Sequence, residues 1–358
     1  MNKVYLIAGG LGFIGRNFCK RIAKDPNNKI IIIDNMLSSN FSGLSDFSQF
    51  NNILFYQESI SRDNFVMYVD CLLHDNKINN IDEIWNFACV ASPKGYRNHS
   101  FEVIDACTKG VKNLCELTYK YRSKLYHTST SEVYGDTKEP MVETNRGYVN
   151  CFGPRSCYDE GKRISETIIY EYIVNYDIDA YIYRLFNTFG PGMMIDDGRV
   201  ISNFIVKALY KQPLEIYGAA EKIRTFCYVD ETIDKMLLAA ANIETRHPIN
   251  IGSDKNSYSL IKLAYTILDL IYPSLSNREK YSLVKTVSPP VDDPFTRIPV
   301  IDNLISKLND VGEKPIEVSF IDGLQCTIDY FRNVLKDVTL NELLERYTFD
   351  TYTTKQFL

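Results

Sequence analysis

The most constraining feature of this 358-residue chain is a glycine loop that joins a short apolar strand to a helix near the N-terminus. Gly9, Gly12 and Gly15 follow an apolar run at residues 4–8 and open an amphipathic stretch at residues 13–24. A second apolar run at residues 29–33 ends at an aspartate. Strand, glycine turn, helix and strand together indicate a βαβ unit, which places the two strands parallel in one sheet.

This glycine loop predicts a dinucleotide site. Glycines let the backbone approach a pyrophosphate, and the start of the helix, at Phe13 and Ile14, faces its negative charge. Asp34 ends the second strand, where a carboxylate can accept hydrogen bonds from both adenosine ribose hydroxyls and repels a 2′-phosphate. We therefore expect NAD rather than NADP, with Asn35 in the same site. The alternative is a tight turn without a ligand, with Asp34 as an ordinary strand-end residue.

Three further apolar runs alternate with three helical stretches after this unit. The runs lie at residues 83–88, 125–128 and 180–184, and the helical stretches lie at residues 100–121, 156–175 and 202–211. Because strands alternate with helices, the chain is expected to be an α/β protein with a Rossmann-type doubly wound parallel sheet.

The pattern changes after about residue 190, where glycine and proline break the chain into shorter elements. Helices are expected at residues 229–242 and 260–271, and a polar, proline-bearing loop at residues 288–299. We predict a mainly NAD-binding Rossmann domain over residues 1–190 and a smaller, mainly sugar-nucleotide-binding lobe over residues 191–335. Elements can interleave between the two. Residues 336–358 are expected to form a C-terminal extension.

Composition restricts the partners and the compartment. Asp and Glu number 45 against 40 Lys and Arg, and no basic cluster stands out, so no nucleic-acid partner is expected. No apolar run approaches the roughly 18 residues that span a membrane, and the first run is too short for a signal peptide. Nine cysteines without a CxxC pair and four dispersed histidines predict a reduced, cytoplasmic protein without a membrane segment or a metal site.

The sequence YDEGK at residues 158–162 predicts an acid/base centre. Tyr158 and Lys162 are one turn apart on one face of the expected helix. A phenol with a pKa of about 10 is a poor base at neutral pH unless a nearby cation stabilises its phenolate. Lys162 and the positive nicotinamide of oxidised NAD would supply this charge, so that Tyr158 removes a hydroxyl proton as hydride leaves for NAD. The chain has 25 tyrosines, so only the combination with the glycine loop makes this pair informative.

A polar segment, HTSTSEVYG at residues 127–135, follows another expected strand. Strands of such sheets end at the ligand crevice. The hydroxyls of Thr130 and Ser131 can hold a sugar hydroxyl, and Glu132 can carry a proton. The alternative is an ordinary polar turn with a helix N-cap.

Six segments resemble the extended short-chain dehydrogenase/reductase superfamily and, within it, the UDP-glucuronic acid decarboxylases, also called UDP-xylose synthases. The segments are TSTSEVYGD at 128–136, GPRSCYDEGK at 153–162, LFNTFG at 185–190, DDGRVISNFI at 196–205, RTFCYV at 224–229 and DDPFTRIP at 292–299. The similarity runs from about residue 3 to residue 335. Sugar-nucleotide 4,6-dehydratases carry Asp then Glu where this chain has Ser131 and Glu132, a pair suited to expelling water. Loss of carbon dioxide needs no acid for a departing hydroxyl, so serine in place of aspartate fits a decarboxylase better.

The resemblance implies a lyase that uses NAD to convert UDP-glucuronate to UDP-xylose through a 4-keto intermediate. Tyr158 is the implied base at C4, Thr130 and Glu132 lie beside the sugar, and Arg224 lies near the reacting carboxylate or the diphosphate. The implied substrate-binding residues are Ser131, Tyr96, Asn187, Arg199, Arg224 and Arg297. Related enzymes pair through helices that here are residues 100–121 and 156–175, so a homodimer is implied.

Three segments depart from the pattern of these relatives. They are residues 218–224 (GAAEKIR), residues 58–60 (ESI), which lack the acid that commonly faces adenine, and residues 86–88 (NFA), where His-Leu-Ala is usual. A sugar-nucleotide 4,6-dehydratase or 4-epimerase on the same fold therefore stays open as an alternative. So does a non-catalytic NAD-binding protein, because a fold does not establish a function.

Overall fold

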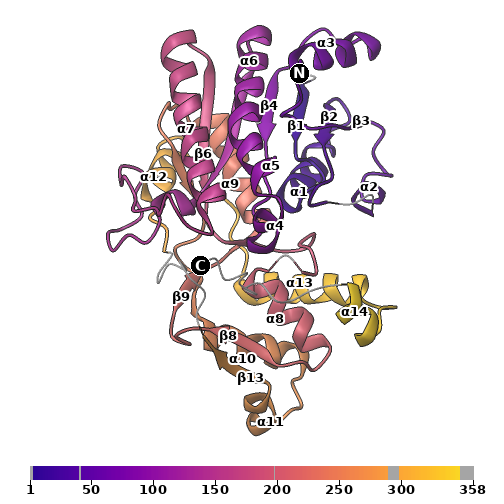
Figure 1. Cartoon of the computed structure of the whole chain (residues 1–358), viewed down its shortest axis with the longest axis vertical. Coiled ribbons are helices and arrows are strands. Elements are labelled where there is room, and N and C mark those ends of the chain that lie inside the picture. The colour runs from indigo at the N-terminus through magenta and orange to yellow at the C-terminus, as the bar shows by residue number, and fades with distance from the viewer. Residues whose placement is uncertain (1–2, 40–41, 197, 289–297, 347–358) are drawn as a thin grey trace.

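A seven-stranded parallel sheet forms the centre of the computed structural model, which describes residues 3–39, 42–196, 198–288 and 298–346 (Figure 1). From one edge to the other the strands are β3 (Ile53–Gln57), β2 (Lys29–Asp34), β1 (Val4–Ala8), β4 (Glu83–Asn86), β5 (Lys124–Thr130), β6 (Asp179–Leu185) and β11 (Ile249–Ile251). Every neighbouring pair is parallel. The expected doubly wound α/β fold is confirmed.

The strand order reverses between β1 and β4, which are neighbours at the centre of the sheet. The chain runs outward from β1 through β2 to β3, and then outward on the other side from β4 through β5 to β6. In open α/β sheets a ligand crevice forms at such a reversal, beyond the carboxyl ends of the strands. The fold therefore places the glycine loop after β1 beside the segments that follow β4 and β5.

Helices cover both faces of the sheet, which explains why its strands are almost continuously apolar. One face packs against α1 (Phe13–Ile22), α9 (Val229–Asn242) and α12 (Asp302–Asp310), and the other against α3 (Phe65–Asp75), α6 (Val111–Tyr121) and α7 (Ser156–Tyr176). On the first face the ring of Trp85 stacks on Tyr126, with centroids 4.3 Å apart, and Phe18 of α1 contacts the same indole at 4.3 Å.

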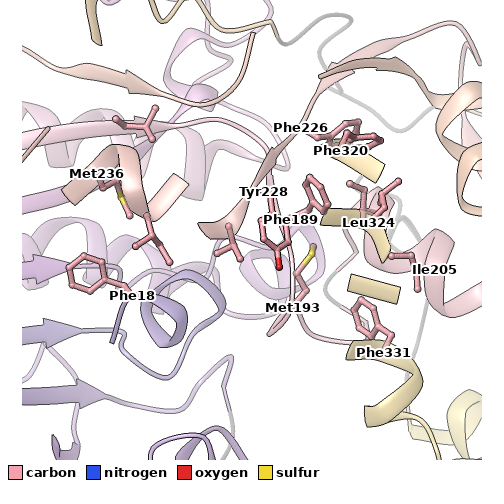
Figure 2. Packing of buried hydrophobic residues seen from close by; sticks show 14 of the residues in the cluster. Phe18, Phe189, Met193, Ile205, Phe226, Tyr228, Met236, Phe320, Leu324 and Phe331 are labelled. Atoms are coloured by element: carbon pink, nitrogen blue, oxygen red, sulfur yellow. The ribbon is translucent and has the colours of Figure 1, made fainter. Parts of the chain in front are cut away.

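The second lobe lies below the sheet in Figure 1. It contains α8 (Val200–Leu209), β8 (Leu214–Tyr217), β9 (Ile223–Thr225), β12 (Ser257–Ser259), α10 (Leu260–Ile271), α11 (Asn277–Ser282), β13 (Val284–Val287) and α13 (Phe320–Val334). The pair β8 and β13 is parallel and the pair β9 and β12 is antiparallel. Figure 2 shows one apolar cluster running from Phe18 and Met236, beside the sheet, through Phe189 and Tyr228 to Phe331 of α13. The two lobes therefore share a continuous core.

The lobes also exchange elements. Strand β11 comes from the later part of the chain, yet it pairs with β6 as the edge strand of the central sheet. Helix α9, which precedes it, packs against α1.

The helix expected at residues 100–121 is interrupted. It consists of α5 (Ser100–Asp105), a π-helical turn (Ala106–Gly110) and α6. Strand β3 and helix α3 were not expected. Of the anticipated extension, α14 (Leu340–Arg346) is described, and most of the loop expected at residues 288–299 lies outside the described residues. Within the described ranges, no helix is long and apolar enough to cross a membrane.

Candidate active site

Two adjoining cavities open at the carboxyl ends of the central strands. The larger, of about 350 Å³, lies between these ends and the second lobe, and the smaller, of about 140 Å³, lies beside the ends of β2 and β3. Both are bordered by the glycine loop. The predicted residues that line the larger cavity are Gly9, Gly12, Phe13, Ile14, Gly15, Tyr96, Thr130, Ser131, Glu132, Tyr158, Lys162, Asn187, Arg199 and Arg224. Asp34 and Asn35 line the smaller one, and Arg297 lies outside the described residues.

The glycine loop is shaped by close backbone contacts. Gly9 has a φ of 76°, and a Cβ there would lie 2.7 Å from the amide nitrogen of Ala88. A Cβ on Gly15 would lie 2.2 Å from the carbonyl oxygen of Gly9. Neither position tolerates a side chain, because the turn has a left-handed residue and α1 starts directly against it. The result is an open cradle at a helix N-terminus, which fits a pyrophosphate.

The carboxylate of Asp34 is buried and fixed at the end of β2. It accepts hydrogen bonds from the backbone N–H of Leu11 at 3.0 Å, from the N–H of Met36 at 2.8 Å and from the Ser39 hydroxyl at 3.0 Å. This network ties the strand end to the glycine loop and holds a negative group at the wall of the smaller cavity. A carboxylate there suits the hydroxyls of an adenosine ribose, so the residues fit NAD.

Tyr158 and Lys162 are both buried in the first half of α7. The ring of Tyr158 stacks on that of Tyr96, with centroids 5.4 Å apart and an interplanar angle of 10°. The ammonium of Lys162 donates a hydrogen bond to the carbonyl oxygen of Thr128 in β5, at 2.8 Å. The stacking and the hydrogen bond together fix the two functional groups relative to the sheet.

The surroundings of Tyr158 act on its phenol in opposite directions. Burial raises the pKa of Tyr158 well above its ordinary value, and the thiol of Cys89 and the carboxylate of Glu132 also raise it. A hydrogen bond with Thr130 and the positive charge of Arg199 lower this pKa. The phenol is therefore neutral in this environment, and additional positive charge is required to make it a base at neutral pH.

Arg155 is a residue of the site to which the sequence analysis gave no role. Its guanidinium donates to the carboxylate of Glu132 at 2.5 Å and to that of Asp159 at 3.3 Å, and all three side chains are buried. Burial lowers the pKa of Arg155. The charge of Glu132 and the other neighbours raise this pKa by more than burial lowers it, so the guanidinium stays charged. Its position within GPRSCYDEGK was the only available signal, because its partners are set by the fold.

The second lobe contributes polar groups to the far wall of the larger cavity. Arg224 in β9 is buried and donates to the carbonyl of Ile223 at 3.1 Å, and Asn187 donates to the carbonyl of Thr225 at 3.2 Å. The guanidinium of Arg199 lies 6.0 Å from the centre of the Phe13 ring, so it bridges the two lobes.

Asn203 is a second cavity residue that the sequence analysis did not single out. Its side-chain oxygen is buried and has no hydrogen-bond partner among the described residues. A buried oxygen without a partner is unusual, and its place in the cavity wall makes Asn203 a candidate ligand contact. Its position in the matched segment DDGRVISNFI was the signal for it.

In the part of the chain that the structure describes, no group of three or more His, Cys, Asp or Glu side chains is placed to hold a metal ion.

Two relatives can be aligned with this chain over nearly its whole length, at about one third sequence identity. The chain is 33% identical over 333 residues to UDP-glucuronic acid decarboxylase 6 of Arabidopsis thaliana, which covers 92% of this chain and 89% of that protein. It is 32% identical over 345 residues to UDP-glucuronic acid decarboxylase 1 of Xenopus tropicalis, which covers 96% of this chain and 76% of that protein.

The fold is shared with solved structures. One is UDP-glucuronic acid 4-epimerase from Bacillus cereus, solved with UDP-glucuronic acid and NAD, with a TM-score of 0.78 and 22% identity over 92% of this chain and 99% of that one. Residues 5–252 match the NAD dependent epimerase/dehydratase family. This match confirms the resemblance drawn from the motifs. With its glycine loop, its Tyr-Lys pair and these relatives, the chain belongs to the NAD dependent epimerase/dehydratase family.

Proposed function

We propose that this protein is an NAD-dependent decarboxylase that converts UDP-glucuronate to UDP-xylose and carbon dioxide through a 4-keto intermediate. One observation carries the proposal: the buried Tyr158 and Lys162 line the same cavity as the glycine loop and the Ser131-Glu132 pair. The relatives named UDP-glucuronic acid decarboxylase support the choice of substrate. The serine at position 131, in place of the aspartate of the dehydratases, supports the choice of reaction.

NAD would be held by the glycine loop at its pyrophosphate and by Asp34 at its adenosine ribose, with Asn35 beside it. When bound, NAD would supply a reversible hydride acceptor for C4 of the sugar. The hydrogen bond to the Thr128 carbonyl places the ammonium group of Lys162 at the end of β5. Its charge favours the phenolate form of Tyr158.

Tyr158 would take the proton of the C4 hydroxyl at its phenolic oxygen. The hydrogen bond with Thr130 and the charge of Arg199 both stabilise the phenolate, so they assist this step. The resulting ketone is β to the carboxylate and accepts the electrons that remain at C5 when carbon dioxide leaves. This step needs no acid for a departing hydroxyl, which agrees with serine at position 131. Glu132, held by Arg155, orients the sugar. It also orients a water molecule, and this water donates the proton that C5 takes up.

The nucleotide and the carboxylate of the substrate would lie along the second lobe. Arg199 and Arg224 carry the positive charge that a diphosphate or a carboxylate needs, and arginine can bind either group with two parallel hydrogen bonds. Asn187 and Asn203 provide polar groups for the rest of the nucleotide. Tyr96 and Ser131 border the sugar, and Arg297 stays a prediction from the resemblance.

The first test is an incubation of the purified protein with UDP-glucuronate, with and without added NAD, in which carbon dioxide and product mass are followed. Carbon dioxide with a UDP-pentose supports the decarboxylase, and release without added NAD indicates a retained cofactor. Absence of release in both reactions contradicts the assignment. A panel of other sugar nucleotides then distinguishes loss of water, as in a dehydratase, from a change of configuration, as in an epimerase.

The protein is also proposed to act as a homodimer in the cytoplasm. The neighbouring helices α5, α6 and α7 expose large apolar side chains in the described structure: Phe101, Ile104, Tyr119, Ile164, Tyr170, Val174 and Tyr176. Tyr119 and Tyr176 contact each other edge to face, at 5.7 Å between ring centroids. An exposed apolar surface of this kind is typical of a protein interface.

All nine cysteines are free thiols, which agrees with a reducing compartment.

A further inference from the structure

Three cysteine side chains lie in one small apolar cluster with Tyr158. Cys89 comes from the segment after β4, Cys107 from the π-helical turn and Cys157 from α7. The sulfur atoms of Cys89 and Cys107 lie 3.6 Å apart, whereas Cys157 donates to the carbonyl oxygen of Tyr96. None of the steps proposed above uses these thiols, so the contact between Cys89 and Cys107 requires a separate explanation.

The chain makes room for this contact at a specific point. A Cβ at Gly161, between the catalytic tyrosine and lysine, would lie 3.2 Å from the sulfur of Cys107 and 3.3 Å from its Cβ. Any larger residue there would press on the Cys107 side chain. The carbonyl of Cys107 accepts a hydrogen bond from Ser165 of α7 at 2.8 Å, which fixes the π-helical turn. Such turns are frequent at functional sites.

The two thiols differ in their ease of ionisation. The hydrogen bond with Cys89 lowers the pKa of Cys107 to about 7 against the effect of burial, and the charge of Lys162 and a hydrogen bond with Ser165 contribute to the lowering. The same hydrogen bond and burial raise the pKa of Cys89. Of the two thiols, Cys107 is therefore the one that ionises more readily. A thiolate beside a second thiol is the arrangement that oxidants attack.

The pair is connected to the cavities through Cys89. This residue is partly exposed and lines both cavities, while Cys107 is buried behind it. A small oxidant that enters the larger cavity reaches Cys89 in its wall, and the sulfur of Cys107 lies 3.6 Å behind that of Cys89. A metal ion does not explain the arrangement, because the described residues contain no group of three or more suitable ligands.

We propose that Cys89 and Cys107 are an oxidation site that a peroxide converts to a reversible disulfide. The thiolate sulfur attacks one peroxide oxygen and the O–O bond breaks, which gives a sulfenic acid and a hydroxide that takes up a proton as water. The second thiol attacks the sulfenic sulfur, the S–O bond breaks and a second water leaves. Two thiols and one hydrogen peroxide thus give one disulfide and two waters. A dithiol reductant reverses the reaction by thiol–disulfide exchange.

The disulfide would act on the neighbouring site. Its sulfur atoms are about 2 Å apart, so the 3.6 Å contact must shorten. The segment after β4 and the π-helical turn then move toward each other beside Tyr158. Because small misplacements of catalytic groups are costly, the oxidised protein is expected to turn over at least about tenfold more slowly. This consequence for turnover rests on the proposed function, but formation of the disulfide does not.

The test uses the full-length protein, treated with hydrogen peroxide, alkylated at its remaining thiols, digested and analysed by mass spectrometry. We expect a peptide pair linked through Cys89 and Cys107 that disappears after treatment with dithiothreitol. Cys107→Ser should abolish this pair. Cys115→Ser, which removes a buried thiol of α6, should retain it. The linked peptides are first identified in the protein without any substitution. A folding defect in Cys107→Ser therefore does not affect their identification.

Two outcomes would overturn the site. In one, Cys89 and Cys107 are both recovered as alkylated thiols while the exposed Cys71 is oxidised. In the other, Cys89 is linked to Cys157 instead. Turnover of each sample is then compared with that of the same sample before oxidation. Unchanged turnover in the linked protein contradicts the effect on catalysis, and absence of turnover before oxidation contradicts the proposed substrate without affecting the peptide map.

Discussion

Arg155 donates a hydrogen bond of 2.5 Å to Glu132 inside the larger cavity, and both side chains are buried. The same guanidinium also holds Asp159. One guanidinium thus pairs with two buried carboxylates, and it belongs to neither the glycine loop nor the Tyr-Lys pair.

Removal of that cation should destabilise the fold. We expect Arg155→Met to lower the free energy of unfolding by about 3–5 kcal/mol, because the substitution removes a guanidinium that pairs with two buried carboxylates. Urea denaturation measures the change. The control is Arg332→Met, which breaks an exposed pair with Asp329 and should cost about 0–1 kcal/mol. Equal effects of the two substitutions would show that the buried pair has no special role.

The phenol of Tyr158 should be essential for turnover. Tyr158→Phe is expected to lower kcat by about 10²–10⁴-fold, because it removes the proton acceptor, while NAD binding persists. Tyr183→Phe is a matched control, since Tyr183 is buried in β6 and its hydroxyl has no partner in the described part of the chain. Steady-state kinetics and NAD titration distinguish the variants. A Tyr158→Phe enzyme with normal kcat would support a non-catalytic NAD-binding protein.

The hydrogen bond between Thr130 and Tyr158 predicts a shift in pH dependence. This bond lowers the pKa of Tyr158, so its loss raises the pKa. Activity needs the phenolate and rises with pH, so the rising limb of kcat/KM should move to higher pH in Thr130→Val, by about one to two pH units. Thr130→Ser retains the hydroxyl and should keep the limb in place. A limb that moves equally in both variants would contradict the role of the hydroxyl, because serine retains it.

The carboxylate of Asp34 should determine cofactor affinity and selectivity. Asp34→Asn is expected to weaken NAD binding by about 10- to 100-fold and to narrow the preference over NADP, because charged hydrogen bonds to the ribose and the repulsion of a 2′-phosphate are both lost. Isothermal titration with each cofactor measures this. Glu58→Gln is the control, since Glu58 lines the same cavity but pairs with Arg62. A larger effect of Glu58→Gln would mean that it, and not Asp34, faces the adenosine.

The exposed apolar surface of α5, α6 and α7 should carry the dimer contact. Phe101→Glu is expected to shift a dimer toward monomers, with at least about a tenfold higher dissociation constant, because it places a charge in an apolar interface. Analytical ultracentrifugation over a concentration series measures the shift. Met67→Glu alters a comparably exposed apolar residue on α3 and should leave the dimer intact. A monomeric parent protein would contradict the proposed assembly.

The glycine loop and its flanking strands were predictable because the signal is local. The spacing of Gly9, Gly12 and Gly15, the apolar runs of β1 and β2 and the acid at their end all lie within one short segment. The place of Thr130 at the cavity followed from the rule that parallel strands end at a common crevice, because Thr130 ends β5.

Other features depend on contacts distant in sequence. Strand β3 is a half-buried edge strand, so its pattern is weak, and β11 has only three residues that become a strand through pairing with β6. The π-helical turn within residues 100–121 leaves no mark in apolar periodicity. The partners of Arg155 are also set by tertiary packing, since Glu132 precedes it in a different element.

The place of β11 has a consequence for the chain as it is synthesised. When β6 has left the ribosome, its outer edge still has free N–H and C=O groups, and the apolar face later covered by α9 is bare. Open strand edges and uncovered apolar faces promote association with other chains. A fragment that stops near residue 190 is therefore expected to aggregate rather than to fold as a separate nucleotide-binding unit. In evolution, the second lobe cannot be exchanged as a separate unit at that boundary, because the chain that leaves this lobe returns to complete the central sheet.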